Sequence, residues 1–68
     1  MAVYKVIEIV GTSKESWEKA ADAAIERASS SLRDLRIAEV VRQDVQIEEG
    51  RIVAYRVRLN VSFRFEDD

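Results

Sequence analysis

The chain has 68 residues, no cysteine and no histidine, and its 11 basic and 13 acidic residues give a net charge of −2. A domain this short buries little apolar surface, and without cysteine it has no disulfides or thiolate metal sites to stabilise it. The lack of histidine removes the commonest general base and transition-metal ligand, and the near-neutral charge gives no electrostatic case for nucleic acid. We therefore expect one domain over residues 1–68 that gains stability by associating with further copies of itself.

The first element is predicted to be a strand at residues 3–10. The segment is rich in Val, Ile and Tyr, and we expect both of its faces to be largely buried. Gly11 ends the strand. Thr12 or Ser13 is expected to cap the helix that follows, because Thr12 and Glu15 have the spacing of a capping box.

A helix is predicted from about residue 14 to about residue 33. Its apolar residues recur every three or four positions and therefore share one face. These residues are Trp17, Ala20, Ala21, Ala24, Ile25, Ala28, Leu32 and Leu35. Most of them are small, so the helix can lie close to the surface that covers it. A helix over this range spans about 30 Å.

Two further strands are predicted, and the last has the clearest pattern in the chain. Residues 35–47 form the second strand, whose imperfect alternation indicates a bulge. The turn at residues 48–50 ends with Gly50, which can adopt a positive φ. Nearly every second residue from 51 to 65 is apolar, which indicates one strand of roughly 50 Å with an apolar face and a basic, polar face. An acidic tail, residues 66–68, closes the chain.

This element order predicts an α+β fold, β-α-β-β, with a three-stranded antiparallel sheet wrapped around one helix. A helix of about 30 Å cannot cover a strand of about 50 Å. Apolar side chains near one end of the strand, such as Phe63 and Phe65 or Val53 and Tyr55, would therefore stay exposed. Soluble monomers rarely tolerate such a patch, so the lengths predict a homo-oligomer. A monomer with a strongly bent strand is the alternative.

Several classes of protein are not favoured by the sequence. It contains no run of about 18 apolar residues, so we expect no membrane-spanning helix. The N-terminus lacks the features of a signal peptide, and the lack of cysteine fits a cytoplasmic protein. Without histidine or cysteine, catalysis would depend on a carboxylate pair, a lysine or a tyrosine, and no spacing singles one out. We expect the protein not to be an enzyme.

Basic side chains near the two C-terminal strands form a candidate anion site. Arg56, Arg58 and Arg64 share one strand face, and Arg36 and Arg42 are expected near them across the sheet. Such arginines bind phosphate or pyrophosphate. The alternative is that they form salt bridges between subunits with neighbouring carboxylates, since opposite charges are common cross-strand pairs.

Oxygen-bearing side chains of the second strand form a candidate cation site. Glu39 and Asp44, together with Gln43, Glu48 and Glu49, carry the oxygen ligands that Ca²⁺ prefers. The spacing is not that of an EF-hand, so enough ligands would converge only where copies meet at a symmetry axis. The alternative is a set of surface carboxylates that are solvated or salt-bridged.

Several segments resemble the dodecin family when their order and spacing are taken together. They are Val3-Tyr4-Lys5, Glu8, Gly11-Thr12-Ser13, an alanine-rich helix with Ala28, Ala38-Glu39-Val40 and Val61-Ser62-Phe63-Arg64-Phe65-Glu66. The resemblance implies a β-α-β-β protomer, twelve of which assemble into a hollow shell of cubic-type symmetry. It also implies sequestration of a flavin, as riboflavin or its nucleotides such as FMN, or of coenzyme A, without turnover.

Two positions that hold flavin in dodecins are occupied by other residues here. The family stacks flavin rings on a tryptophan at the start of the second strand and binds the ring edge with a glutamine of the third. The resemblance puts Ile37 and Arg56 at these positions, and makes Arg36, Ile37, Arg42 and Arg56 the candidate cofactor residues. Stacking contributes roughly 1–3 kcal/mol per ring in comparable systems. An aliphatic side chain has no π face, so weakened flavin binding is implied.

A second branch of the family lacks this tryptophan and is associated with calcium. Four short segments resemble that branch: Ser16-Trp17-Glu18, Arg36-Ile37, Gln43-Asp44 and Tyr55-Arg56. The alternative function is therefore a calcium-binding or purely structural dodecameric shell, with Glu39 and Asp44 as the candidate metal ligands.

Overall fold

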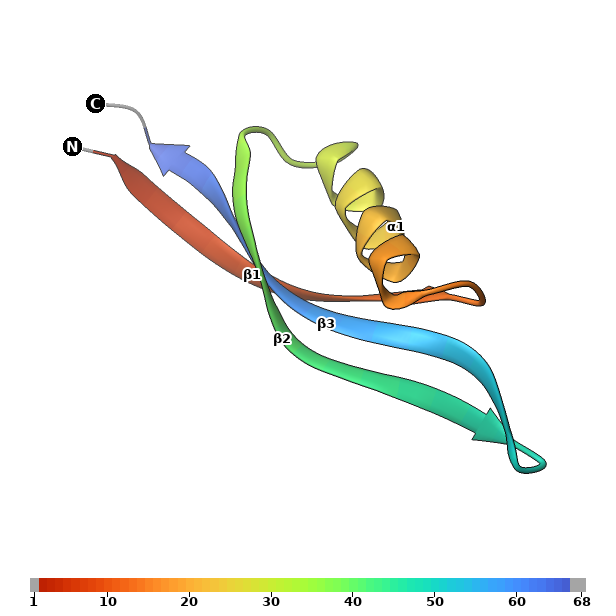
Figure 1. Ribbon diagram of the computed structural model, residues 1–68. Helices are drawn as coiled ribbons and strands as arrows, with labels where there is room; N and C mark the ends of the chain where they lie inside the picture. The colour runs from red at the N-terminus through yellow and green to blue at the C-terminus, as the bar shows by residue number, and fades with distance from the viewer. Residues whose placement is uncertain (1, 67–68) are drawn as a thin grey trace.

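The computed structural model describes residues 2–66, in the order β1 (Val3–Ser13), α1 (Trp17–Ser29), β2 (Leu35–Glu48) and β3 (Arg51–Glu66). The strands form one antiparallel sheet in the order β1-β3-β2, and α1 lies against one face of it (Figure 1). The predicted β-α-β-β fold is confirmed. Asp67 and Asp68 of the predicted tail lie outside the described residues. Within residues 2–66, no helix has the length and apolar character needed to cross a membrane.

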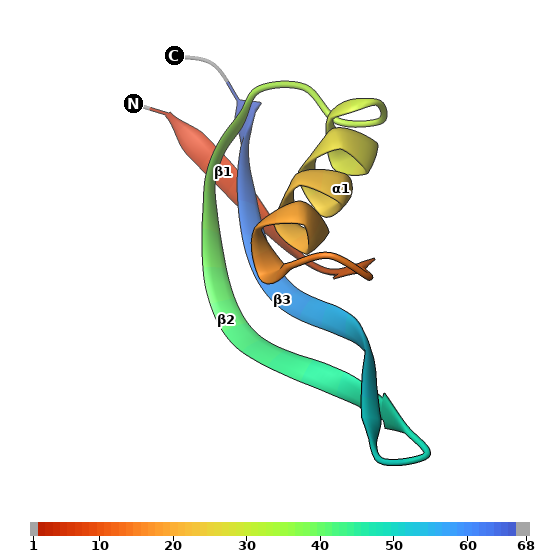
Figure 2. The same cartoon turned by 45° about the vertical axis from the view of Figure 1, so that its right-hand side comes forward.

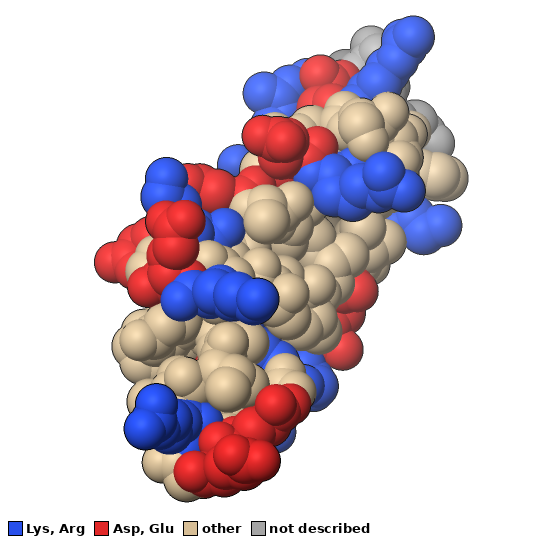
Figure 3. All heavy atoms as spheres, turned by 90° about the vertical axis from the view of Figure 1, so that its right-hand side faces the viewer, with Lys and Arg blue, Asp and Glu red and all other residues tan. Residues whose placement is uncertain are grey.

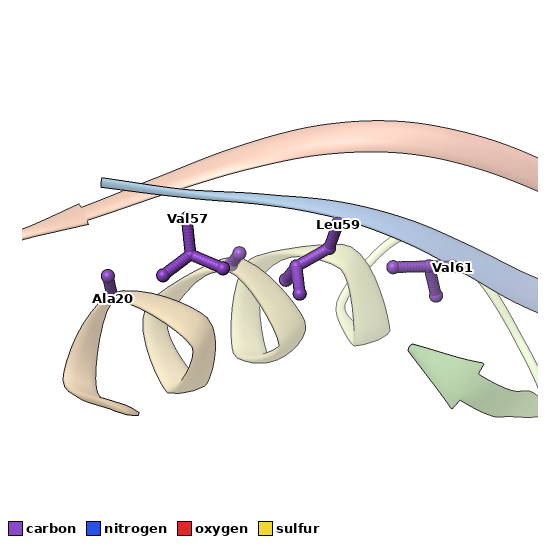
Figure 4. Packing of buried hydrophobic residues seen from close by; sticks show 5 residues of the cluster. Ala20, Val57, Leu59 and Val61 are labelled. Carbon is purple, nitrogen blue, oxygen red and sulfur yellow. The ribbon is translucent and has the colours of Figure 1, made fainter. Parts of the chain in front are cut away.

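The core lies between the central strand β3 and the helix. Val57, Leu59 and Val61 are each 1% exposed, and they pack with Ala20 and Ala24 of α1 (Figure 4). These strand residues alternate with polar ones, so one face of β3 is buried and the other is not. The alanines keep α1 close to the sheet, as their small size predicted.

Gly11 of β1 allows the same close approach. A Cβ added at Gly11 would lie 2.9 Å from the Ala24 Cβ and closer still to the Ala20 carbonyl oxygen. Any larger residue would therefore push the helix away from the sheet.

The predicted N-terminal end of the helix is wrong. Thr12 and Ser13 still pair with β3, so the chain continues as a strand where a cap was expected. The N-cap is Ser16, whose hydroxyl accepts a hydrogen bond from the Lys19 backbone N–H at 3.0 Å. Strand pairing with residues far along the chain outweighed the local capping pattern.

The predicted C-terminal end of the helix is also wrong, because the helix ends at Ser29 and has only 13 residues. The Ser29 hydroxyl donates to the Ile25 carbonyl oxygen at 2.6 Å, and the Ser30 hydroxyl donates to the Arg27 carbonyl oxygen at 2.7 Å. Serine hydroxyls that compete for backbone groups favour helix ends over helix interiors. The helix is therefore about 20 Å long, shorter than expected.

β1 is an edge strand, and in the protomer it is not buried on both faces as predicted. Val6 and Val10 are 58% and 51% exposed, whereas Ile7 and Ile9 on the helix side are half-buried. The exposed valines leave an apolar stripe on the side of the sheet away from α1.

Bulges in β2 decide which of its side chains share a face. Its pairing with β3 shifts at three places: Leu35/Ile37, Val40/Arg42 and Gln46/Ile47. Because of the middle shift, Arg42 and Asp44 lie on the face of Ile37, where strict alternation would place Gln43. The predicted bulge is confirmed. The bulge brings the charged residues of β2 onto the face away from the helix.

The β2–β3 hairpin extends beyond the helix (Figures 1 and 2). β1 pairs with β3 only from Tyr55 onward, so residues 46–54 form a two-stranded segment, here called the distal arm. At its tip Glu49 and Gly50 have φ of 52° and 76°. This is the backbone of a type I′ hairpin turn, and it confirms the positive φ expected at Gly50.

Because α1 is shorter than β3, apolar residues of the sheet stay exposed, as predicted. The protomer measures 52 × 20 × 13 Å, and Phe65 at one end of β3 is 61% exposed. Ile47 and Ile52 face each other across the distal arm and are 62% and 54% exposed. Val53 and Tyr55 are half-buried.

Candidate ligand-binding site

The predicted site residues gather on the face of the sheet away from α1. Cross-strand rows on this face are Val6–Ser62–Ile37, Glu8–Asn60–Glu39, Val10–Arg58–Arg42 and Thr12–Arg56–Asp44. Neighbouring strands lie about 4.8 Å apart, so each row spans about 10 Å. This face therefore brings the candidate anion site and the candidate cation site within a few rows of each other.

A groove of about 410 Å³ lies at one end of this face, lined by Tyr4, Arg36, Ile37, Ser62 and Arg64. Ile37 is 69% exposed there and Tyr4 is 49% exposed. Three predicted residues, Arg36, Ile37 and Arg64, thus lie together. Sequence reasoning missed Tyr4 and Ser62 as lining residues, because their position depends on the register of both edge strands against β3.

Arg56 and Asp44 form a bidentate ion pair within the protomer. Arg56 Nε donates to Asp44 Oδ1 at 2.7 Å, and Arg56 Nη2 donates to Oδ2 at 3.0 Å. Hydrogen bonding to Arg56 lowers the pKa of Asp44, partial desolvation opposes this, and the charges of Arg58 and Arg42 lower it further. The same pair raises the pKa of Arg56. Both carboxylate oxygens of Asp44 are therefore already engaged by a cation.

Arg42 and Arg58 face each other directly across β2 and β3. Like charges in this position repel. The Asp44 carboxylate in the next row offsets the repulsion, since both arginines stabilise its charged form. The region carries an excess of positive charge close to Asp44, which suits an anionic group better than a second cation.

Glu39 lies in a different setting from Asp44. Its row continues through Asn60 to Glu8 on β1, a residue that the cation prediction had not included. Two strand spacings, about 10 Å, separate the two glutamates, whereas Ca²⁺ binds its ligands at about 2.3–2.6 Å. Within residues 2–66, no three acidic side chains of one protomer converge on a metal position. A Ca²⁺ site at Glu39 would need oxygen ligands from another copy.

Trp17 lies away from this face and joins α1 to the hairpin. Its Nε1 donates to the Asp44 carbonyl oxygen at 3.1 Å, and its ring meets that of Tyr55 edge to face, with centroids 5.2 Å apart at 75°. The ring is half-buried and packs against the core cluster. Trp17 is therefore a core residue of the protomer, because its indole N–H and its ring both have partners within the fold.

A family model described as Dodecin matches residues 3–66. The chain belongs to the dodecin family. A calcium dodecin from Mycobacterium tuberculosis is 48% identical over 64 residues, which cover 94% of this chain and 90% of that protein. A dodecin from Thermus thermophilus is 45% identical over 65 residues, which cover 96% and 94%. The family resemblance seen in the sequence is thereby confirmed.

Solved dodecin structures share this fold. The M. tuberculosis calcium dodecin, described as calcium chelating with a novel calcium-binding site, matches with a TM-score of 0.85 at 47% identity, covering 98% of this chain and 96% of that one. A dodecin from Streptomyces davaonensis matches with a TM-score of 0.91 at 38% identity, covering 97% of both chains. The fold of this chain is therefore shared with dodecins from M. tuberculosis and S. davaonensis.

Proposed function

We propose that this chain assembles into a cytoplasmic homododecameric shell that sequesters a small ligand without catalysing a reaction. The single observation that supports the proposal is the exposure of Ile37. This side chain is 69% exposed in a groove, on a face of the sheet where Val6 and Val10 are also exposed. An apolar stripe of this kind needs a cover. In a shell of copies, the same surface gains both a cover and a shared ligand pocket.

Sedimentation tests the assembly. The purified chain is expected to behave as a particle of twelve times the 7.8 kDa protomer. A stable single chain at micromolar concentration would contradict the shell and every pocket shared between its copies.

Calcium is the ligand that we favour. Ile37 offers a flavin no aromatic face, and a relative with 48% identity carries the name calcium dodecin. Glu39 is the stronger candidate ligand, because Arg56 already engages both oxygens of Asp44. Carboxylates of neighbouring copies would complete the coordination shell, which takes about six to eight oxygens.

Heat denaturation with calcium and with a chelator tests this assignment. Saturating Ca²⁺ at about 100 times its dissociation constant stabilises a one-site protein by about 2.7 kcal/mol, so the midpoint should rise. Glu39→Gln should abolish the rise, and Glu26→Gln on the exposed side of α1 should leave it unchanged. An identical midpoint in calcium and in chelator would contradict calcium binding.

Flavin or coenzyme A is the second candidate, favoured by the groove at Ile37. Arg36 presents a guanidinium group suited to phosphate or carbonyl oxygens, and Tyr4 contributes an exposed aromatic ring. Ile37→Trp should raise riboflavin affinity by about 5- to 150-fold, the equivalent of roughly 1–3 kcal/mol of stacking. Quenching of riboflavin fluorescence measures the change, with Glu26→Trp on the exposed side of α1 as the control. Equal affinity in both variants would exclude the Ile37 groove as a flavin site.

A further inference from the structure

Arg42 of β2 and Arg58 of β3 face each other across the sheet, on the side away from α1. Facing residues of antiparallel strands have Cα atoms about 4.5–5.5 Å apart, and like charges at such positions repel each other. On the face of the molecule shown in Figure 3, by contrast, basic and acidic side chains are interspersed. The facing arginines therefore lower the stability of the sheet unless a negative charge lies close to both of them.

The carboxylate on one side of this pair is Asp44, in the next row of the sheet. Both arginine charges lower the pKa of Asp44, so both act on its carboxylate. However, Arg56 already binds the two carboxylate oxygens, at 2.7 and 3.0 Å. Asp44 balances one positive charge, and its ion pair with Arg56 leaves the facing arginines uncompensated on this side.

The carboxylates on the other side of the pair are Glu39 and Glu8, which share the neighbouring row. Successive rows on one face are about 7 Å apart along a strand. Within the described part of the chain, the side chains of Arg42 and Arg58 form no hydrogen bond or ion pair. Val10, which completes their row on β1, is apolar. The two guanidinium groups therefore keep their N–H donors for a ligand.

We propose that Arg42 and Arg58 together bind an oxyanion of the phosphate class, either inorganic phosphate or the phosphate group of a larger molecule. Each guanidinium is a planar fork whose N–H groups match two oxygens of such an anion. A dianion bound by both forks would balance both positive charges and offset their repulsion. Arg42 is exposed and Arg58 is half-buried, so the ligand can reach the pair from solvent.

This site is separate from the groove at Ile37 and from the proposed calcium ligand Glu39. Four residues of β3, about 13 Å, separate Arg58 from Ser62, which is the partner of Ile37. Calcium at Glu39 would neutralise one of the carboxylates beside the pair, so it should favour the anion. Both arginines belong to one protomer, so the inference does not rest on the proposed shell.

Thermal unfolding at pH 7 and constant ionic strength tests the site, with phosphate replacing chloride. The midpoint of the wild-type protein should rise to a plateau as phosphate increases, because a ligand that binds only the folded state stabilises it. Arg58→Gln and Arg42→Gln should each weaken the apparent phosphate affinity by about tenfold or more, through the loss of charge-assisted hydrogen bonds. Arg33→Gln, an exposed position between α1 and β2, is the control and should leave the affinity unchanged.

Arg58→Glu covers the case in which the neutral variants do not fold. It gives Arg42 a facing carboxylate, which is a favourable cross-strand pair, so the protein should fold and lose the response to phosphate. Arg33→Glu makes the same change of charge elsewhere and should keep the response. Ribose 5-phosphate distinguishes the two sources of the anion. Tighter binding than that of inorganic phosphate would indicate a larger ligand, and equal or weaker binding would indicate the free ion.

Equal midpoints of the wild-type protein in phosphate and in chloride would overturn the proposal. This is the result expected if carboxylates of another copy neutralise the two arginines in an assembly. An equal loss of affinity in Arg33→Gln and Arg58→Gln would also overturn it, because the response would then reflect net charge. Sedimentation of the same samples reports on the shell separately, so a particle of another size would refute the proposed assembly and leave the phosphate result intact.

Discussion

The buried segment of β3 and the distal arm belong to one hairpin and share one alternating pattern, yet they differ in burial. Leu59 is 1% exposed, whereas Ile52 is 54% exposed. Both lie in the same strand, and only Leu59 has the helix against it. The difference teaches that alternation assigns a side chain to a face, whereas burial requires an element on that face. In this chain the helix supplies the cover for one half of the strand only.

The largest predicted effect comes from Leu59→Ala. Removing a fully buried leucine side chain should lower the free energy of unfolding by about 2–5 kcal/mol, through lost burial and the cavity left behind. Guanidinium denaturation followed by Trp17 fluorescence measures it. The loss should appear at every protein concentration.

Ile52→Ala is the matched variant in the arm. Its effect should depend on protein concentration, because Ile52 is exposed in the protomer and only another copy in the proposed shell would cover it. A loss of stability that is independent of protein concentration and as large as that of Leu59→Ala would contradict this, because it would mean that Ile52 stabilises the protomer itself as much as Leu59 does.

Gly11→Ala should have the next largest effect. The new Cβ would lie 2.9 Å from the Ala24 Cβ, so α1 must move, and overpacking of this kind destabilises by about 1–3 kcal/mol. Thermal denaturation checks the loss. Gly50 is the matched control in the arm, since a Cβ there meets nothing within 4 Å and only its φ of 76° opposes substitution. Asparagine, which tolerates positive φ, should therefore be accepted at Gly50 and rejected at Gly11.

Glu49→Asn should stabilise the hairpin by up to about 1 kcal/mol. Glu49 has a φ of 52°, a region that disfavours most side chains by about 1–2 kcal/mol and that asparagine tolerates better. Asn-Gly is also the preferred pair for a type I′ turn. Glu48→Asn removes the same charge without relieving a positive φ. Equal unfolding midpoints for the two variants would show that backbone strain at the tip is unimportant.

The smallest predicted effect concerns the Arg56–Asp44 pair at the base of the arm. Because the pKa of Asp44 is lowered in the folded protein, the pair stabilises the fold above the ordinary Asp pKa of about 3.9. That contribution disappears as the pH falls through the lower folded-state pKa. Asp44→Asn should therefore be less stable than the wild type at pH 7, and this difference in stability should disappear at acidic pH. Unfolding midpoints measured from pH 7 to pH 2 check it, with Asp22→Asn on α1 expected to show no such closure.

The amino-acid sequence by itself determined the element order, the apolar face of β3, the small-residue face of α1 and the turn at Gly50. These features depend on hydrophobic periodicity and on turn residues, and both are properties of residues that are contiguous in the sequence. The family resemblance could also be read from the sequence, because its segments keep their order and spacing. The helix ends were predicted wrongly for two reasons. Thr12 and Ser13 pair with residues of β3 that are distant in the sequence, and the hydroxyls of Ser29 and Ser30 bind backbone carbonyl oxygens at the end of the helix.

Only the tertiary structure decided which residues meet on the sheet. The bulge near Val41 turned Arg42 and Asp44 to one face, and the register of β1 brought Tyr4 into the groove of Ile37. The same pairing left residues 46–54 without a third strand. Register and bulge positions are set by contacts between residues far apart in the chain, and such contacts form only when the strands have paired.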